Sequence, residues 1–148
     1  EVFLRPLTGQ GSTYRYIGAE AKAIDGGFES IGDMGYFDED GYLYLADRQT
    51  DMILSGGANI YPAEVEAAID SFPGVRSSAA IGLPHEDLGN YVHAIVDAPE
   101  GIIEEDLLNH LGERLVRYKI PRTIEFSNEP MRDDAGKVRR KSLRQDRL

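Results

Sequence analysis

Three charged residues stand out for the chemistry that their side chains allow: Asp33, Arg48 and Lys137. An ionised carboxylate can accept hydrogen bonds from two hydroxyl groups at once, and a guanidinium can contact ribose and phosphate oxygens together. An ammonium offsets negative charge that moves during a reaction. Taken one at a time, the same residues are also typical of a turn aspartate and of solvated surface cations. The surrounding sequence must therefore decide between these interpretations.

Two glycine-containing segments differ in what they could bind. Gly56-Gly57 follows the apolar run Met52-Ile53-Leu54, and glycine backbones can adopt positive φ and be approached closely by a ligand, although a plain turn uses the same property. Gly136-Lys137 has no glycine at the upstream spacing of a P-loop, and Val138 stands where that motif needs Ser or Thr. The second segment is therefore not a P-loop.

Several other kinds of site are excluded by what the chain contains. It has no cysteine, so disulfides, thiolate zinc sites and cysteine nucleophiles are ruled out. His85, His93 and His110 are scattered without the spacing of metal ligands. We expect these three histidines to be structural.

The charge of the chain is unevenly distributed. The whole chain of 148 residues carries a formal net charge of -10, whereas residues 130–148 hold seven bases against three acids and so carry +4. An acidic body disfavours a nucleic-acid partner, and the basic tail is either a local anion contact or a solvated face. The sequence offers no apolar run that could form a transmembrane segment and no signal region, so we expect a cytoplasmic protein.

Hydrophobic patterning predicts an α+β fold. One helix should begin at Pro62 and reach about residue 71, and a second should start near Ile103 and end at Lys119-Ile120-Pro121. Asp38-Glu39-Asp40-Gly41 should close a hairpin, Pro84 to Asn90 should be a polar loop, and a short basic helix should follow Gly136. The predicted strands cover residues 2–4, 36–37, 42–45, 52–54, 75–81, 91–96 and 123–126.

We predict two parts in the chain. Residues 1–46 read as strands and turns, and residues 47–148 read as a compact mixed unit large enough for its own core. The chain opens with Glu1 directly before the apolar run Val2-Phe3-Leu4. We therefore expect it to be a piece of a longer protein.

Three segments in order carry a family resemblance. They read GDMGYFDEDG over 32–41, DRQTDMILSGGANIYPAEVE over 47–66 and GKVRR over 136–140. In order and spacing they resemble the adenylate-forming superfamily, and specifically the end of an acyl-CoA or aryl-CoA synthetase. The resemblance implies a small mobile C-terminal domain at 47–148, preceded at 1–46 by the end of the large N-terminal adenylating domain.

The resemblance also implies an activity. Such enzymes join a carboxylic acid to ATP, release pyrophosphate and pass the acyl group to coenzyme A. Asp33 matches the acid that holds the ribose hydroxyls, and Arg48 matches the basic residue that contacts the nucleotide. Lys137 matches the lysine that reaches the active site in the adenylating arrangement, although Met131 stands where the motif usually has proline.

Other positions match parts of the same motifs. Thr50 falls at the hinge about which the small domain rotates, where similar enzymes commonly carry Asp or Lys. Gly56 and Gly57 match the loop that lines the pantetheine tunnel. Tyr118 and Arg122 flank Pro121 where some aryl-CoA ligases contact the coenzyme. These roles are what the resemblance implies.

The remaining parts of such an enzyme are not in this sequence. The Ser/Thr/Gly-rich phosphate loop, the residues that hold Mg2+ and the acid pocket belong to the large N-terminal domain, so we expect the chain alone to be inactive. The segment around Gly56 leans toward fatty or aromatic acids. Two alternatives stay open: an adenylating module that delivers to a carrier protein, and a non-enzymatic interaction domain.

Overall fold

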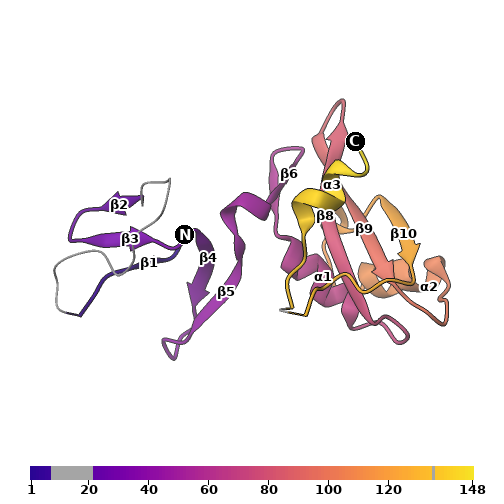
Figure 1. Cartoon of the computed structure of the whole chain (residues 1–148), viewed down its shortest axis with the longest axis horizontal. Helices are drawn as coiled ribbons and strands as arrows, with labels where there is room; N and C mark the ends of the chain where they lie inside the picture. The colour runs from indigo at the N-terminus through magenta and orange to yellow at the C-terminus, as the bar shows by residue number, and fades with distance from the viewer. Residues whose placement is uncertain (8–21, 135) are drawn as a thin grey trace. The chain divides into compact units, whose positions relative to one another are not determined.

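The computed structural model describes residues 1–7, 22–134 and 136–148, and Figure 1 traces its elements along the chain. These residues form two compact units, Glu1–Thr50 and Asp51–Leu148. The first unit thus includes residues 47–50 in addition to the predicted segment 1–46. Part of the predicted strand-rich segment, residues 8–21, and Ala135 of the last loop lie outside the described residues.

The first unit contains a small sheet and a hairpin. The strands are β1 (Phe3–Leu4), β2 (Ala23–Ile24), β3 (Phe28–Ser30), β4 (Asp33–Phe37) and β5 (Leu43–Arg48). In the sheet, β3 pairs antiparallel with both β1 and β2. In the hairpin, the Asp38 carboxylate accepts hydrogen bonds from the backbone N–H groups of Asp40 and Tyr42 at 3.1 and 2.8 Å. The predicted hairpin is thus confirmed, with an aspartate-closed turn.

The second unit is built on a mixed sheet whose central strand is β9. The strands are β6 (Ile53–Ser55), β7 (Ala58–Ile60), β8 (Ser77–His85), β9 (Gly89–Asp97) and β10 (Thr123–Ser127). β9 pairs antiparallel with β8 and parallel with β10, and β6 joins it through Ser55 and Gly89. The predicted α+β class is confirmed.

The segment Pro84 to Asn90 is not the loop that the sequence predicts. β8 continues through His85 and β9 begins at Gly89, so most of the segment is strand. Gly89 has φ +74°, a value that glycine adopts without a steric penalty, and this permits a tight turn between the two strands. The polar composition of the segment therefore reflects exposure at the hairpin end rather than a loop.

Three helices flank this sheet: α1 (Pro62–Asp70), α2 (Glu104–Gly112) and α3 (Arg140–Gln145). Pro62 occupies the first turn of α1 as predicted, because its fixed φ suits that position. α2 ends at Gly112 rather than near Lys119, and a short 3-10 helix, η2 (Arg117–Lys119), follows. Glycine is a poor helix former, and Val116 is already extended at ψ 146°, so the apolar repeat outlasts the helix.

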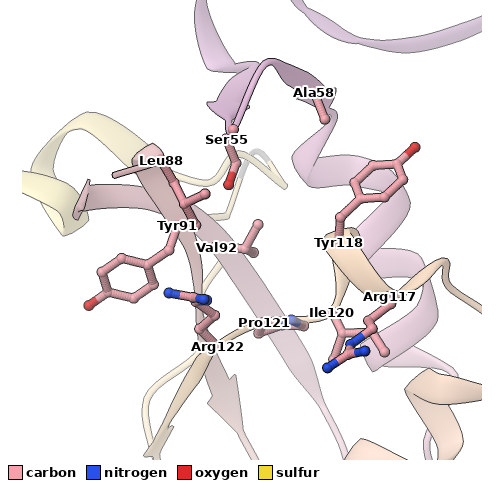
Figure 2. A pocket seen from close by; sticks show the side chains of 11 residues that line it. Ser55, Ala58, Leu88, Tyr91, Val92, Arg117, Tyr118, Ile120, Pro121 and Arg122 are labelled. Carbon is pink, nitrogen blue, oxygen red and sulfur yellow. The ribbon is translucent and has the colours of Figure 1, made fainter. Parts of the chain in front are cut away.

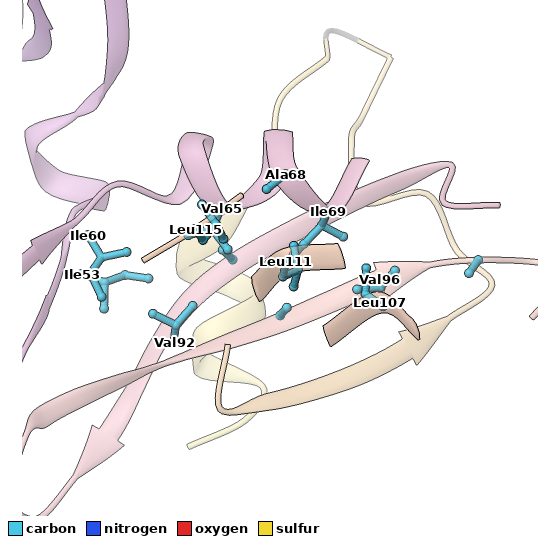
Figure 3. Packing of buried hydrophobic residues seen from close by; sticks show 13 residues of the cluster. Ile53, Ile60, Val65, Ala68, Ile69, Val92, Val96, Leu107, Leu111 and Leu115 are labelled. Carbon is cyan, nitrogen blue, oxygen red and sulfur yellow. The ribbon is translucent and has the colours of Figure 1, made fainter. Parts of the chain in front are cut away.

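The core of the second unit lies between the sheet and the helices α1 and α2. Val65 and Ile69 of α1 and Leu107 and Leu111 of α2 are fully buried against the sheet, and Figure 3 shows their side chains meeting between these elements. Ile95 points to the opposite face of the sheet, as alternation along a strand requires. There it packs in a second cluster with Ile81, Leu83, Tyr91, Met131 and, from α3, Leu143.

No helix among the described residues has both the length and the apolar character needed to cross a membrane.

Candidate functional site

Asp33 and Arg48 face each other across the hairpin of the first unit. They are register partners on β4 and β5, and Arg48 Nε lies 3.7 Å from Asp33 Oδ1. The Arg48 side chain is 72% exposed and that of Asp33 is 28% exposed. Exposed ion pairs of this length contribute little stability, so both groups remain available to a ligand that offers hydroxyl and phosphate oxygens.

Thr50 is the last residue of the first unit. It is exposed and lies in the short 3-10 helix η1 (Gln49–Asp51), which follows β5 directly. The predicted hinge residue is therefore located where one compact unit ends and the next begins.

Gly56 and Gly57 form the two-residue turn between β6 and β7. Their φ angles are +56° and +83°, so the positive φ predicted from the glycine pair is confirmed. The Gly56 N–H donates to the Leu88 carbonyl at 2.9 Å, and a Cβ at Gly56 would lie 3.1 Å from Leu88 Cδ2. A Cβ at Gly57 would meet no atom within 4 Å. A side chain at Gly57 would thus meet open space, whereas a side chain at Gly56 would press against Leu88.

A pocket of about 760 Å³ opens beside this turn. Figure 2 shows the aromatic rings of Tyr91 and Tyr118 on opposite sides of the space, with the guanidinium of Arg122 near Tyr91 and that of Arg117 near Ile120. The lining residues are Ser55, Gly56, Ala58, Leu88, Tyr91, Val92, Arg117, Tyr118, Ile120, Pro121 and Arg122. The structure therefore brings together the glycine turn and the Tyr118–Arg122 segment, which are far apart in the sequence.

The cations of the pocket differ in their partners. Arg122 Nη1 lies 2.6 Å from His85 Nε2, and an imidazole carries no negative charge that could neutralise the guanidinium. Lys119, which lies between the pocket residues in sequence, instead binds both carboxylate oxygens of Glu64 at 2.7 Å. Arg117 and Tyr91 carry no local sequence signal of a binding role, since only their place in the folded pocket distinguishes them from other residues.

Lys137 does not line this pocket. It lies in a turn in which its backbone N–H donates to Asp133 Oδ1 at 2.9 Å and its carbonyl accepts from the Asp133 N–H at 3.1 Å. The turn also contains Gly136, with φ +73°. The side chain of Lys137 is exposed, so its ammonium can reach a ligand that comes from outside the turn.

Comparison with known families decides the identity of the fold. The profile of the AMP-binding enzyme C-terminal domain matches residues 64–137, which is half of the chain. The chain belongs to the AMP-binding enzyme C-terminal domain family. The resemblance to adenylate-forming enzymes, predicted from the three motifs, is confirmed.

Individual relatives of this AMP-binding enzyme C-terminal domain are CoA ligases. Long-chain-fatty-acid–CoA ligase FadD13 of Mycobacterium tuberculosis is 43% identical over 128 residues, which is 86% of this chain and 25% of the relative. The 2-succinylbenzoate–CoA ligase of Geobacillus kaustophilus is also 43% identical over 128 residues, 85% of this chain and 26% of its own length. The chain thus spans about a quarter of the length of these relatives.

A solved relative has the same fold. It is the o-succinylbenzoate CoA synthetase MenE from Bacillus subtilis, in complex with the acyl-adenylate intermediate OSB-AMP, with a TM-score of 0.74 and 36% identity. The similarity covers 81% of this chain and 25% of that chain. It bears out the predicted α+β fold of the small C-terminal domain of adenylate-forming enzymes.

In this AMP-binding enzyme C-terminal domain, His110 and His93 lie within the packing of the second unit. His110 Nε2 is 2.8 Å from Ser71 Oγ, and its ring packs edge-on against Phe72. The ring of His93 is buried, with Nδ1 2.7 Å from Thr123 Oγ1. Among residues 1–7, 22–134 and 136–148, no group of three or more His, Cys, Asp or Glu side chains could hold a metal ion.

Burial disfavours the charged form of the His93 ring. Its pKa is lowered because burial disfavours the charged ring, while Glu125 opposes this effect. Glu125 Oε2 lies 3.4 Å from the buried Nε2 without hydrogen-bond geometry. The Glu125 carboxylate instead accepts two hydrogen bonds from Arg147 at 2.7 Å, which lower its pKa.

Proposed function

We propose that this chain is the C-terminal part of an acyl-CoA synthetase. The complete enzyme would activate a carboxylic acid with ATP to an acyl-adenylate, release pyrophosphate and transfer the acyl group to the thiol of coenzyme A. The observation that carries the proposal is the pocket beside the Gly56-Gly57 turn, because it offers arginine charge and aromatic surface next to open backbone. The names of the CoA-ligase relatives support the same activity.

The first half-reaction would use the hairpin of the first unit. The Asp33 carboxylate is proposed to hold the ribose hydroxyls of ATP, with Arg48 beside it for ribose or phosphate oxygens. An oxygen of the substrate carboxylate attacks the α-phosphorus, and pyrophosphate leaves with its electron pair. The Lys137 ammonium would offset the charge that moves in this step. Mg2+ would be held by parts of the large N-terminal domain outside these 148 residues.

The second half-reaction would use the pocket of the second unit. Arg117 and Arg122 suit the phosphates of coenzyme A, and Tyr118 suits the face of its adenine. The pantetheine arm would pass the glycine turn at Gly57, where a side chain is absent and the space is open. The sulfur then attacks the acyl carbonyl, and AMP leaves.

The change between the two arrangements would occur at Thr50. Its location between the compact units supports the proposed hinge, because hinges need backbone freedom at the end of an element more than a particular side chain. In this proposal residues 1–46 end the large adenylating domain and residues 47–148 form the mobile domain.

The acid is proposed to be fatty or aromatic. Relatives of equal identity include a ligase named for long-chain fatty acids and one named for 2-succinylbenzoate. The pocket that selects the acid would lie in the large N-terminal domain.

The test is an assay of the complete enzyme from the source of this chain. Pyrophosphate release from ATP is measured with long-chain fatty acids and with aromatic acids, and acyl-CoA formation is measured with and without coenzyme A. We expect acid-dependent pyrophosphate release and a thioester on coenzyme A. Transfer to a phosphopantetheine carrier protein in preference to coenzyme A would contradict the proposal, as would no adenylation of any acid.

A further inference from the structure

A buried carboxylate lies at the centre of the second unit. Glu66 on α1 is 1% exposed and accepts a hydrogen bond from the Ala80 N–H of β8 at 2.9 Å. A buried carboxylate is stable only when cations or several hydrogen bonds surround it. Its cationic partners come from the C-terminal segment of the chain.

Arg140, the first residue of α3, makes the closer contacts. Its Nη2 donates to Oε1 and Oε2 of Glu66 at 2.9 and 2.8 Å, and its Nε lies 3.2 Å from Oε1. The Arg140 side chain is 16% exposed, so the pair is shielded from solvent. The planar guanidinium fixes direction as well as distance, which an ammonium does not.

Arg132 reaches the same carboxylate from the other side of the Lys137 turn. Its Nη2 lies 3.4 Å from Glu66 Oε2, and its Nη1 donates to the Gly136 carbonyl at 3.3 Å. Lys137 is therefore flanked in sequence by two arginines that both contact Glu66. The turn that carries the exposed lysine is held at both ends on one buried group.

Arg140 also contacts the start of the second unit. Its Nη1 donates to Asp51 Oδ2 at 3.0 Å, and Asp51 directly follows Thr50. The same guanidinium thus joins the lysine-bearing segment, the buried helix and the residue next to the proposed hinge. These three parts of the second unit are held together through one side chain.

We propose that Glu66 and Arg140 are positioning residues for Lys137 in the adenylation step. The inference rests on the proposed function, since it assigns the cluster to the half-reaction that uses this lysine. A merely structural role explains the cluster less well, because apolar side chains of similar volume usually stabilise a core as well as a buried ion pair does. The directional hydrogen bonds of Arg140 instead fix the backbone position from which the exposed Lys137 side chain extends.

The test combines Arg140→Lys with Lys137→Ala in the complete enzyme. Arg140→Lys keeps a cation beside Glu66 but removes the fork of hydrogen bonds. We expect it to lower adenylation about 10-fold or more, since small misplacements of a catalytic group have effects of this size. In the Lys137→Ala background the same change should lower adenylation less than about 2-fold, because the positioned group is gone. Transfer from presynthesised acyl-adenylate to coenzyme A should stay near normal.

Arg144→Lys is the matched control. Arg144 lies on the same helix and donates to Asn90 Oδ1 at 3.3 Å, outside the cluster, so both half-reactions should be unchanged. Asp51→Asn is the milder second variant, which keeps all contacts of Glu66 and should lower adenylation selectively but less. Equal losses in both half-reactions, or full additivity of Arg140→Lys with Lys137→Ala, would overturn the positioning role.

A second measurement does not depend on the activity. Nuclear magnetic resonance relaxation of the 148-residue chain reports the order of the Lys137 amide. We expect an order parameter near about 0.85 in the unchanged chain and below about 0.6 in Arg140→Lys, the range of flexible backbone. An unchanged order parameter contradicts the positioning role whatever the enzyme does. If the complete enzyme adenylates no acid but Arg140→Lys still loses this order in the 148-residue chain, the results contradict the proposed function alone.

Discussion

At the scale of single residues, Lys137 offers the sharpest separation between the two proposed half-reactions. Its side chain is exposed, and it lies outside the pocket that contains Gly56. A group that stabilises charge on the leaving pyrophosphate matters for adenylation only. The two half-reactions should therefore respond differently when the ammonium is removed.

We predict that Lys137→Ala in the complete enzyme lowers adenylation by about 100-fold or more, the scale of losing one donor to a transition state. Transfer from supplied acyl-adenylate to coenzyme A should be nearly unchanged. Lys141→Ala is the control, because Lys141 is an exposed base of the neighbouring helix α3. Comparable losses in the two half-reactions would show that Lys137 acts in both or in structure.

The second prediction at this scale concerns His93 and stability. Its pKa is lowered by burial, so the unfolded chain, whose histidine titrates near the ordinary value of about 6.5, binds a proton first as the pH falls. The free energy of unfolding should be constant above that value and should decrease as the pH drops below it. The salt-bridged Glu125, whose pKa is lowered, adds its own loss only at more acidic pH.

The measurement is urea unfolding of the 148-residue chain between about pH 7.5 and pH 5. His93→Gln should flatten the dependence in this window, because it removes the buried titrating ring. A wild-type stability that does not change between these pH values would contradict the buried neutral state of His93.

At the scale of elements, the turn between β6 and β7 lies on the proposed path of the pantetheine arm of coenzyme A. Both glycines have positive φ, so any side chain there strains the backbone. A Cβ at Gly57 meets no atom within 4 Å, so the first added carbon makes no clash within the described chain. Backbone strain appears with any side chain at Gly57, whereas obstruction of a ligand should grow with the length of the side chain. Substitutions of different length therefore separate the two effects.

We predict that Gly57→Leu in the complete enzyme releases pyrophosphate but accumulates acyl-adenylate, because leucine blocks the approach of the thiol. Gly57→Ala should have the same strain, about 1 kcal/mol, without the block. Stopped reactions analysed for acyl-adenylate and acyl-CoA distinguish the two variants. Normal thioester formation by Gly57→Leu from supplied acyl-adenylate would show that the turn does not line the path.

The sequence predicted the elements whose signals are local. Pro62 marked the start of α1, the Asp38 turn marked the hairpin, and the glycine pair marked positive φ. The end of α2 was missed because an apolar repeat continues to Leu115, which is buried although it lies beyond the helix. Periodicity reports which side chains face the core and does not report where the backbone leaves the helix.

The pocket could be predicted only in part. The sequence indicated Tyr118 and Arg122 through a motif, but the contribution of Arg117 and Tyr91 depends on the pairing of β8 with β9 and on η2. The cluster at Glu66 was not predicted at all. Glu66 is far from Arg132 and Arg140 in the chain, and no local pattern shows that a charged residue of an amphipathic helix is buried.

At the scale of the whole molecule, the two units hold different parts of the proposed machinery. The first carries the Asp33–Arg48 pair, and the second carries the pocket and Lys137. The chain spans about a quarter of the length of its CoA-ligase relatives. The rest of such a protein would supply the phosphate loop and the acid pocket.

We therefore predict that the 148-residue chain alone releases no pyrophosphate from ATP in response to a carboxylic acid. Catalysis by positioning needs both reactants held together, and in the proposed enzyme the acid pocket and the phosphate loop lie outside these 148 residues. The measurement is a pyrophosphate-release assay with rigorously purified chain, a long-chain fatty acid and an aromatic acid, with the complete enzyme as the positive control. The same preparation should bind coenzyme A weakly by calorimetry, because the lining of the proposed pocket comes from the second unit alone, and Arg122→Gln should weaken that binding further. Turnover by the pure chain would mean that its own residues form a complete active site, and the division of labour between this chain and the rest of the enzyme would then be wrong.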